Sequence, residues 1–202
     1  VGGQINAYTS REHTAYYAKV LHGDAPLAMD ILADILQDST FDPEELARER
    51  AVVLQEIGQS YDTPDDIIFD HFQATAFPDQ PLGRPVLGRP EIIENMPRDA
   101  IMDHMRQTYG GEAMVLSAAG QVDHDTVVAM SEELFAGLQR QSGGETETGA
   151  YSGGDFREDR ELEQVHFVLG FPGFSYHDEA FYAASVLSSL FGGGMSSRLF
   201  QE

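Results

Sequence analysis

Two glutamates on one predicted helix are the residues whose type and spacing first suggest chemistry. Glu49 and Glu56 lie seven residues apart, about two turns of an α-helix, so their side chains point almost the same way. On a helical wheel both fall between Val52 and Val53, away from the solvated side. Carboxylates in an apolar surround are costly unless a cation or hydrogen bonds compensate them.

Two interpretations of this pair are open. In the ordinary one, the glutamates extend to solvent or pair with arginines of the same helix. In the other, one glutamate is a metal ligand and the second is a carboxylate of the surrounding site. The spacing alone does not choose between them.

The helix that must position these glutamates has a well-marked beginning. Asp42 is a suitable N-cap, Pro43 suits the first turn, and the acidic residues Glu44 and Glu45 favour the positive end of the helix dipole. The side chains expected to form its buried stripe are Leu46, Val53, Leu54 and Ile57.

The charge of the chain narrows the classes of partner. The 202 residues carry a formal net charge of -22, which argues against nucleic acid because phosphate would be repelled. Such acidity is compatible with binding a basic peptide, or it serves solubility alone. The sequence has no apolar run as long as a membrane span, so no membrane partner is expected.

The donors for a metal are restricted by composition. The chain has no cysteine, so any metal would be held by histidine and carboxylate. No two histidines show His-x-x-x-His or His-x-x-Glu-His spacing, so the chain contains no complete zinc motif. The seven histidines are His13, His22, His71, His104, His124, His166 and His177.

The order of the predicted elements indicates an α+β fold, with an antiparallel sheet packed against helices. A hairpin is expected over 4–20, and the irregular, proline-rich and glycine-rich loop 77–89 is long enough to suggest a function. Further helices are predicted near 24–36, 63–77, 90–95, 98–108, 123–138 and 178–190, and further strands over 113–119, 156–161 and 163–171.

The composition also predicts how the chain divides. Residues 139–154 are rich in Gly, Ser, Thr and Gln, which is typical of a linker. We therefore predict an incomplete metallopeptidase-like domain over 1–138, the linker 139–154, and the beginning of a second, similar α+β domain over 155–202. Both ends of the sequence are expected to fall inside structure.

Four separated segments, in this order, carry a resemblance to a known family: 2–14, 49–56, 81–88 and 192–202. Together they resemble the pitrilysin/insulinase family of zinc peptidases, on the branch similar to the mitochondrial processing peptidase β subunit and its bacterial relatives. The resemblance covers nearly the whole chain. Each segment alone is a weak signal, whereas four in the right order are specific.

The resemblance implies a role for each glutamate. Members of the family bind Zn²⁺ through an inverted His-x-x-Glu-His helix and a distal Glu, and the Glu of the motif is the general base. By this match Glu56 is the distal zinc ligand and Glu49 an accessory acidic residue near the metal. The histidines and the base would lie upstream of Val1.

The resemblance also implies where a substrate binds. The strand around Asn6, Ala7 and Tyr8 resembles the edge that pairs with an extended polypeptide by strand addition. Asp66 and Asp70, four residues apart on one helix face, match acidic residues that receive an arginine near the cleavage site. An ordinary edge strand and a first-turn aspartate are the alternatives.

The function expected from the resemblance is that of a fragment of a zinc metalloendopeptidase that acts on extended polypeptides and is similar to a processing peptidase. The alternative is a catalytically inactive family member that serves as a structural or substrate-binding subunit. A homodimer or heterodimer is expected, in the bacterial cytoplasm or the mitochondrial matrix.

Overall fold

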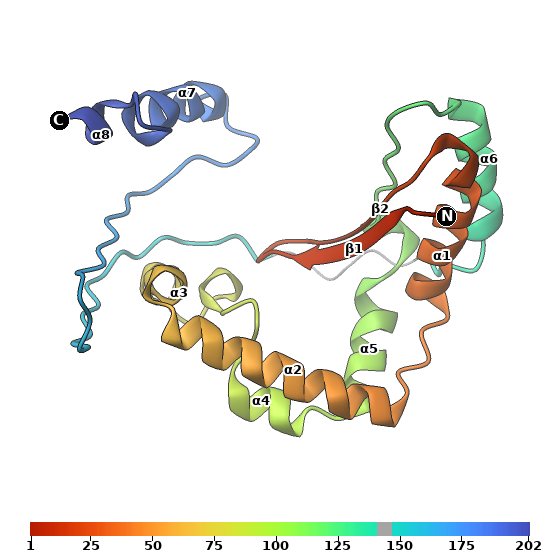
Figure 1. Cartoon of the computed structure of the whole chain (residues 1–202), viewed down its shortest axis with the longest axis horizontal. Helices are drawn as coiled ribbons and strands as arrows, with labels where there is room; N and C mark the ends of the chain where they lie inside the picture. Colours follow the sequence, from red (N-terminus) through yellow and green to blue (C-terminus); the bar gives the residue numbers. More distant parts are fainter. Residues whose placement is uncertain (141–146) are drawn as a thin grey trace. The chain divides into compact units, whose positions relative to one another are not determined.

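The computed structural model of the chain describes residues 1–140 and 147–202. It divides into two compact units, Val1–Phe167 and Val168–Glu202. In the described residues, a short hairpin comes first and is followed by helices (Figure 1). They are β1 (Gln4–Thr9), β2 (Thr14–Lys19), α1 (Ala25–Gln37), α2 (Pro43–Asp62), α3 (Pro64–Ala76), α4 (Pro90–Asn95), α5 (Arg98–Thr108), α6 (His124–Leu134), α7 (Phe181–Gly192) and α8 (Arg198–Gln201), with 3₁₀ turns η1 (His22–Asp24), η2 (Pro81–Gly83) and η3 (Gly111–Ala113).

The hairpin forms as predicted. β1 and β2 pair antiparallel with Asn6 opposite Tyr17 and Thr9 opposite Thr14, and the amide of Ser10 donates to the carbonyl of His13 to close the turn. Helix α1 packs against β2 and α6, and its Ala28 and Ala33 are among the few buried apolar residues of the chain. The third buried apolar residue of the described chain is Ala76, at the end of α3.

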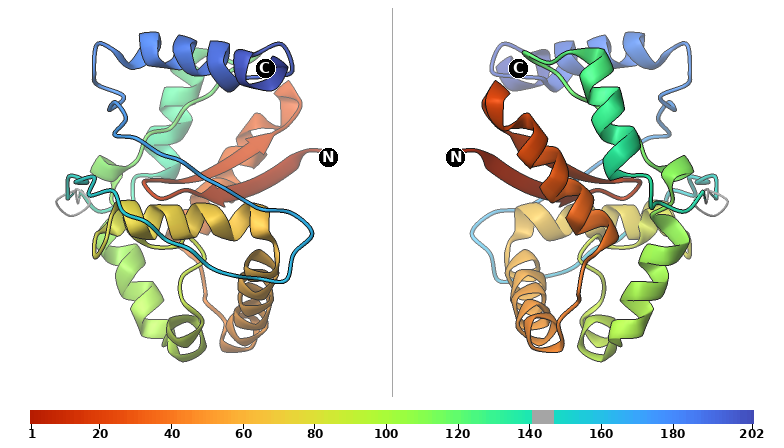
Figure 2. Two further views of the ribbon diagram at one scale, coloured as in Figure 1. Left: turned by 90° about the vertical axis from the view of Figure 1, so that its left-hand side faces the viewer. Right: turned by 90° about the vertical axis from the view of Figure 1, so that its right-hand side faces the viewer.

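Helices α2, α3 and α4 form a second helical group (Figure 2). Arg50 of α2 donates to the carbonyls of Ile93 and Met96, which ties α2 to the end of α4. The predicted cap of α2 is confirmed, because the side chain of Asp42 accepts hydrogen bonds from the first-turn amides.

Helix α5 joins the two groups of the first unit. At its start, the guanidinium of Arg98 donates to the carbonyls of Thr40 and Phe41, just before α2. At its end, the hydroxyl of Tyr109 lies 3.2 Å from that of Tyr16 on β2. Burial, together with this hydrogen bond, raises the pKa of Tyr16.

The predicted α+β class, with an antiparallel sheet packed against helices, is confirmed. The predicted strands at 113–119, 156–161 and 163–171 are wrong. In the described part of the chain, the ladder between β1 and β2 is the only one, and these three segments run extended beside no partner strand. Val115 and Val165 are each 94% exposed, because an alternating apolar sequence without a neighbouring strand has no sheet in which to bury its side chains.

The second unit contains α7 and α8, which pack on each other. Gly192 ends α7, Gly193 is its C-cap, and Ser197 is the N-cap residue of α8. The division of the chain at 139–154 remains a prediction, and its residues 141–146 lie outside the described residues. In the described ranges, no helix has both the length and the apolar character needed to cross a bilayer.

Candidate functional site

The two glutamates of α2 lie at the margin of its packed face. Leu46, Val53 and Ile57 are half-buried where α2 meets α3 and α4, while Glu49 and Glu56 are both exposed. The prediction that both carboxylates sit inside an apolar surround is therefore wrong. Glu49 and Glu56 lie on the same side of α2, as helix geometry predicts. That side is next to the surface covered by α3 and α4, so both carboxylates remain hydrated.

The arginines of α2 are occupied by other groups. Arg48 lies 2.5 Å from Glu45 and 3.9 Å from Glu44, and Arg50 binds backbone carbonyls. Within residues 1–140 and 147–202, the side chains of Glu49 and Glu56 have no hydrogen bond or ion pair. Of the two forms of the ordinary interpretation, pairing with helix arginines is absent from the described residues, whereas extension of both side chains to solvent is present.

A catalytic zinc ion needs about three protein ligands and an open position for water. The described residues include no group of three or more His, Cys, Asp or Glu side chains placed to hold a metal ion. Glu56 offers one carboxylate of the right chemical type. The described residues therefore do not make a zinc site among themselves.

The outer edge of β1 is open to pairing. In an antiparallel ladder the hydrogen-bonded pairs alternate, and the bond from Ser10 to His13 fixes which residues face β2. The main-chain groups of Ile5, Ala7 and Thr9 consequently point away from β2. Every residue of β1 is exposed, so an extended peptide can reach this edge.

The three residues predicted to bind substrate lie on this strand. The side-chain oxygen of Asn6 accepts a hydrogen bond from the amide of Ala7 at 2.8 Å, so it already occupies one outward donor of the edge. The hydroxyl of Tyr8 lies 3.2 Å from Nε2 of His13, and the two rings meet edge to face. The strand is therefore accessible and held at its far end by the turn.

The two aspartates of α3 differ in their surroundings. Asp70 is half-buried, and its Oδ1 accepts from the guanidinium of Arg11 at 2.5 Å. Asp66 is exposed, and its side chain has no hydrogen bond or ion pair within the described ranges. The pair is thus on one helix, as predicted, but one member is already bound to an arginine of the chain itself.

A polar cluster that the sequence did not predict lies where α2 meets α3. Nε2 of His71 is 3.3 Å from Glu158, and Arg160 is 2.9 Å from the same carboxylate. Arg160 also donates to the carbonyl of Tyr61 and stacks over its ring at 4.2 Å. The hydrogen bond from Arg160 lowers the pKa of Glu158 below its ordinary value.

This cluster belongs to a longer contact between α3 and the extended segment 150–166. Ser152 donates to the carbonyl of Ala76 at one end of the helix, Phe156 stacks on His71, and His166 lies 3.3 Å from Asp65 near the other end. The segment therefore packs along α3 rather than in a sheet. The alternation of apolar residues in this segment predicted strands, whereas the structure uses the segment as an extended chain against α3.

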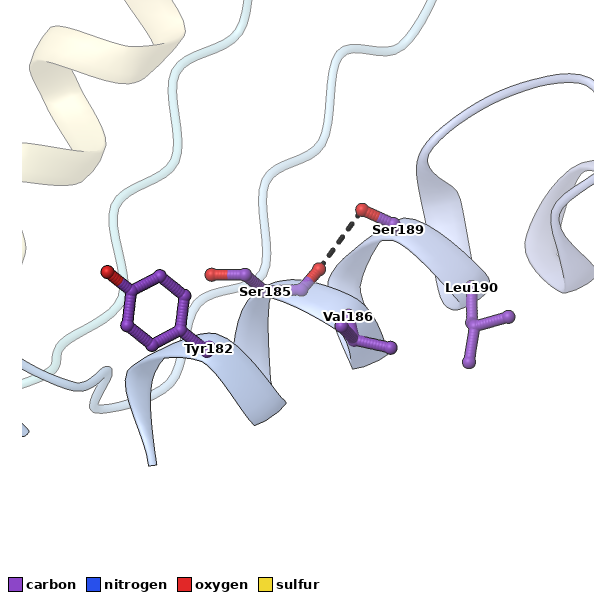
Figure 3. Close-up of a pocket in the computed structure, with 5 residues that line it drawn as sticks. All are labelled: Tyr182, Ser185, Val186, Ser189 and Leu190. Carbon is purple, nitrogen blue, oxygen red and sulfur yellow. Dashed lines mark hydrogen bonds between the residues drawn. The ribbon is translucent and has the colours of Figure 1, made fainter. Parts of the chain in front are cut away.

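A shallow hollow of about 440 Å³ lies on α7 (Figure 3). Its two serines are engaged within the helix, since Ser185 donates to the carbonyl of Phe181 and Ser189 to that of Ser185. The residues that line it are Tyr182, Ser185, Val186, Ser189 and Leu190. The hollow contains none of the predicted site residues and no carboxylate or imidazole.

The fold is shared with chains of solved structures. A crystal structure of a protease from Helicobacter pylori matches with a TM-score of 0.80 and 22% identity, over 100% of this chain and 51% of that one. A chain of Complex III2 from Candida albicans matches with a TM-score of 0.75 and 21% identity, over 95% of this chain and 46% of that one. These likenesses concern the fold.

The sequence comparisons define the family. Residues 1–90 match the model described as Insulinase (Peptidase family M16), and residues 95–202 match the Peptidase M16 inactive domain. A Rickettsia felis protein described as an uncharacterized zinc protease is 42% identical over 100% of this chain. The chain belongs to the M16 peptidase family, as the four sequence segments had indicated. It spans about half the length of the relatives it matches, 49% of the Rickettsia protein.

Proposed function

We propose that the complete protein is a zinc metalloendopeptidase that hydrolyses extended polypeptides, and that this chain supplies one metal ligand and the substrate edge. The observation that carries the proposal is the state of Glu56. It is a glutamate in an M16 chain, on a helix whose two arginines are both engaged by other groups, and it has no partner among the described residues.

In this proposal Glu56 is a zinc ligand and Glu49 is an accessory carboxylate near the metal. The remaining ligands come from outside this chain, because the described residues do not complete a site. When bound, zinc would polarise the scissile carbonyl and activate a water molecule. The part of this chain is to hold a charged oxygen donor on a rigid helix that begins with a formed cap.

The substrate would add as a strand along β1. Its main chain would pair with the outward groups of Ile5, Ala7 and Thr9, and the side chain of Asn6 would leave the amide of Ala7 to admit it. Tyr8 would contact the peptide from the exposed face of the hairpin. This mode favours extended polypeptides over folded ones.

A preference for arginine near the cleavage site would depend on Asp66 and Asp70. The exposed Asp66 presents a whole carboxylate, whereas Asp70 already shares Oδ1 with Arg11. A substrate guanidinium would therefore be held mainly by Asp66, with Oδ2 of Asp70 as a second acceptor. This arrangement is the basis for proposing a processing-type specificity.

The second candidate is a catalytically inactive subunit that binds substrate or supports a partner. The observation that favours it is the match of residues 95–202 to a domain described as inactive. Assembly as a homodimer or heterodimer fits either candidate, and one structural neighbour belongs to a multisubunit complex.

The two candidates are separated by hydrolysis of an extended, fluorogenic peptide by the complete protein. An active enzyme will cleave it, will lose activity to a chelator, and will regain activity with Zn²⁺. Glu56→Gln will abolish cleavage, while the control Glu132→Gln, an exposed glutamate on α6, will not. Cleavage that survives chelation would exclude a zinc peptidase, and tight peptide binding without cleavage would establish the inactive subunit.

A further inference from the structure

We propose that Arg11 is a positioning residue that fixes the substrate edge β1 relative to helix α3, with Asp70 as its partner. The catalytic consequence rests on the proposed function, whereas the structural consequence does not. Arg11 lies in the turn that directly follows β1, and nothing in its local sequence reveals its contacts, since Asp70 is 59 residues away.

The guanidinium of Arg11 joins three parts of the first unit. One nitrogen donates to Oδ1 of Asp70 at 2.5 Å, and another donates to the carbonyl of Arg84 at 3.1 Å. The side chain of Arg11 is only 17% exposed and that of Asp70 is 31% exposed. A charge-assisted pair with this degree of burial holds its geometry better than an ion pair on an open surface.

The carbonyl of Arg84 is presented by a tightly folded loop. Gly83 immediately precedes it and ends the 3₁₀ turn η2, and a Cβ at Gly83 would collide with the carbonyl of Phe77. The glycine thus allows the loop to pack against the end of α3. Arg11 therefore binds two acceptors whose positions are both set by the α3 region.

The turn that carries Arg11 is itself constrained. The hydroxyl of Ser10 accepts from the amide of His13 at 3.1 Å, donates to its carbonyl at 3.0 Å, and lies 2.9 Å from its Nδ1. Because Thr9 at the end of β1 is adjacent to this turn, a shift of Arg11 would move the strand end with it. Within the described ranges, the hydrogen bonds between the hairpin and the α3 region come from Arg11.

This link matters because α3 packs on α2, the helix that carries Glu49 and Glu56. Arg11 thereby sets the distance between the edge where a peptide would add and the carboxylates proposed to act near the metal. Without this link the edge would be held less well for pairing with an extended peptide, so the loss is expected in KM. Positioning of this kind is a role distinct from contact with the substrate.

The test is a double-mutant cycle in the complete protein. Arg11→Met and Asp70→Asn should each raise KM for every extended peptide by about tenfold, with kcat changed by less than about twofold, and the double variant should be no worse than either single one. Arg11→Lys should recover part of the loss, because lysine reaches one acceptor but not both. The matched control is Arg106→Met, an arginine paired with Asp103 on its own helix.

A second readout does not depend on activity. Amide hydrogen exchange of residues 5–14 should accelerate in Arg11→Met and in Asp70→Asn, but not in Arg106→Met. If the complete protein proves inactive, faster exchange still supports the positioning role while the proposed function fails. Unchanged exchange and unchanged KM in Arg11→Met would overturn the inference. A loss confined to arginine-bearing peptides in Asp70→Asn alone would assign Asp70 to the substrate instead.

Discussion

Helices α2 and α3 follow one another in the chain, and each carries two carboxylates on one face at helical spacing. On α2, Glu49 and Glu56 are exposed and have no partner in the described ranges. On α3, Asp70 is half-buried against Arg11. The difference separates carboxylates available to a ligand from one that maintains the architecture, although their sequence patterns look alike.

The largest expected effect concerns the two glutamates of α2 and tests whether they are equivalent. In the complete protein, Glu56→Gln should reduce kcat/KM for peptide hydrolysis by at least about a hundredfold, since a ligand is lost. Glu49→Gln should cost about tenfold, the usual order for a group that supports a metal site. Equal losses in both variants would contradict the separate roles, and the comparison is made by steady-state kinetics.

The aspartates of α3 provide the second comparison. Asp66→Asn should raise KM by about tenfold for peptides with an arginine near the cleavage site and leave other peptides unchanged, because one charged hydrogen bond is lost. Asp70→Asn should affect both classes of peptide, since it releases Arg11. A matched pair of peptides that differ only in Arg or norleucine measures the distinction. The same change in KM from Asp66→Asn and Asp70→Asn, for both peptides, would contradict separate roles for the two aspartates.

A smaller effect is expected at the cap that orients α2. Asp42→Ala should lower the free energy of unfolding by about 1 kcal/mol, since two first-turn amides lose their acceptor. Asp42→Asn is the control, because it retains an acceptor at the same position. Urea denaturation measures both. A loss in Asp42→Asn as large as that in Asp42→Ala would point to charge rather than capping.

The smallest effect is a pH dependence at the cluster between α3 and the segment 150–166. The pKa of Glu158 is lowered in the folded chain, first by its hydrogen bond from Arg160, so its stabilising contribution is present above the ordinary value of 4.5. That contribution is lost as the pH falls through the lowered pKa. Glu158→Gln should therefore show a flatter decline of the unfolding temperature below pH 4.5 than wild type. Glu163→Gln, an exposed glutamate nearby in sequence, should behave as wild type.

Local signals in the sequence were sufficient for much of the fold. Asp42 and Pro43 marked where α2 begins, and two alternating runs marked the hairpin. Segments 113–119 and 156–171 failed because a strand depends on a neighbour that local sequence does not specify. These segments alternate in sequence, but in the described residues they pair with no neighbouring strand.

The candidate site was predictable only in part, for a similar reason. The shared direction of Glu49 and Glu56 follows from helix geometry, whereas their exposure depends on how α3 and α4 cover α2. The pairing of Arg11 with Asp70 joins residues far apart in sequence, so no spacing rule reveals it. Such contacts decide which of several similar carboxylates is free to bind a ligand.

The central claim is that Glu56 binds the metal of the complete protein. The most direct measurement is the zinc content of purified wild type and Glu56→Gln by inductively coupled plasma mass spectrometry, with circular dichroism to establish that both are folded. The account predicts about one zinc per wild-type molecule and almost none in the folded variant. Wild-type zinc content in Glu56→Gln would contradict it.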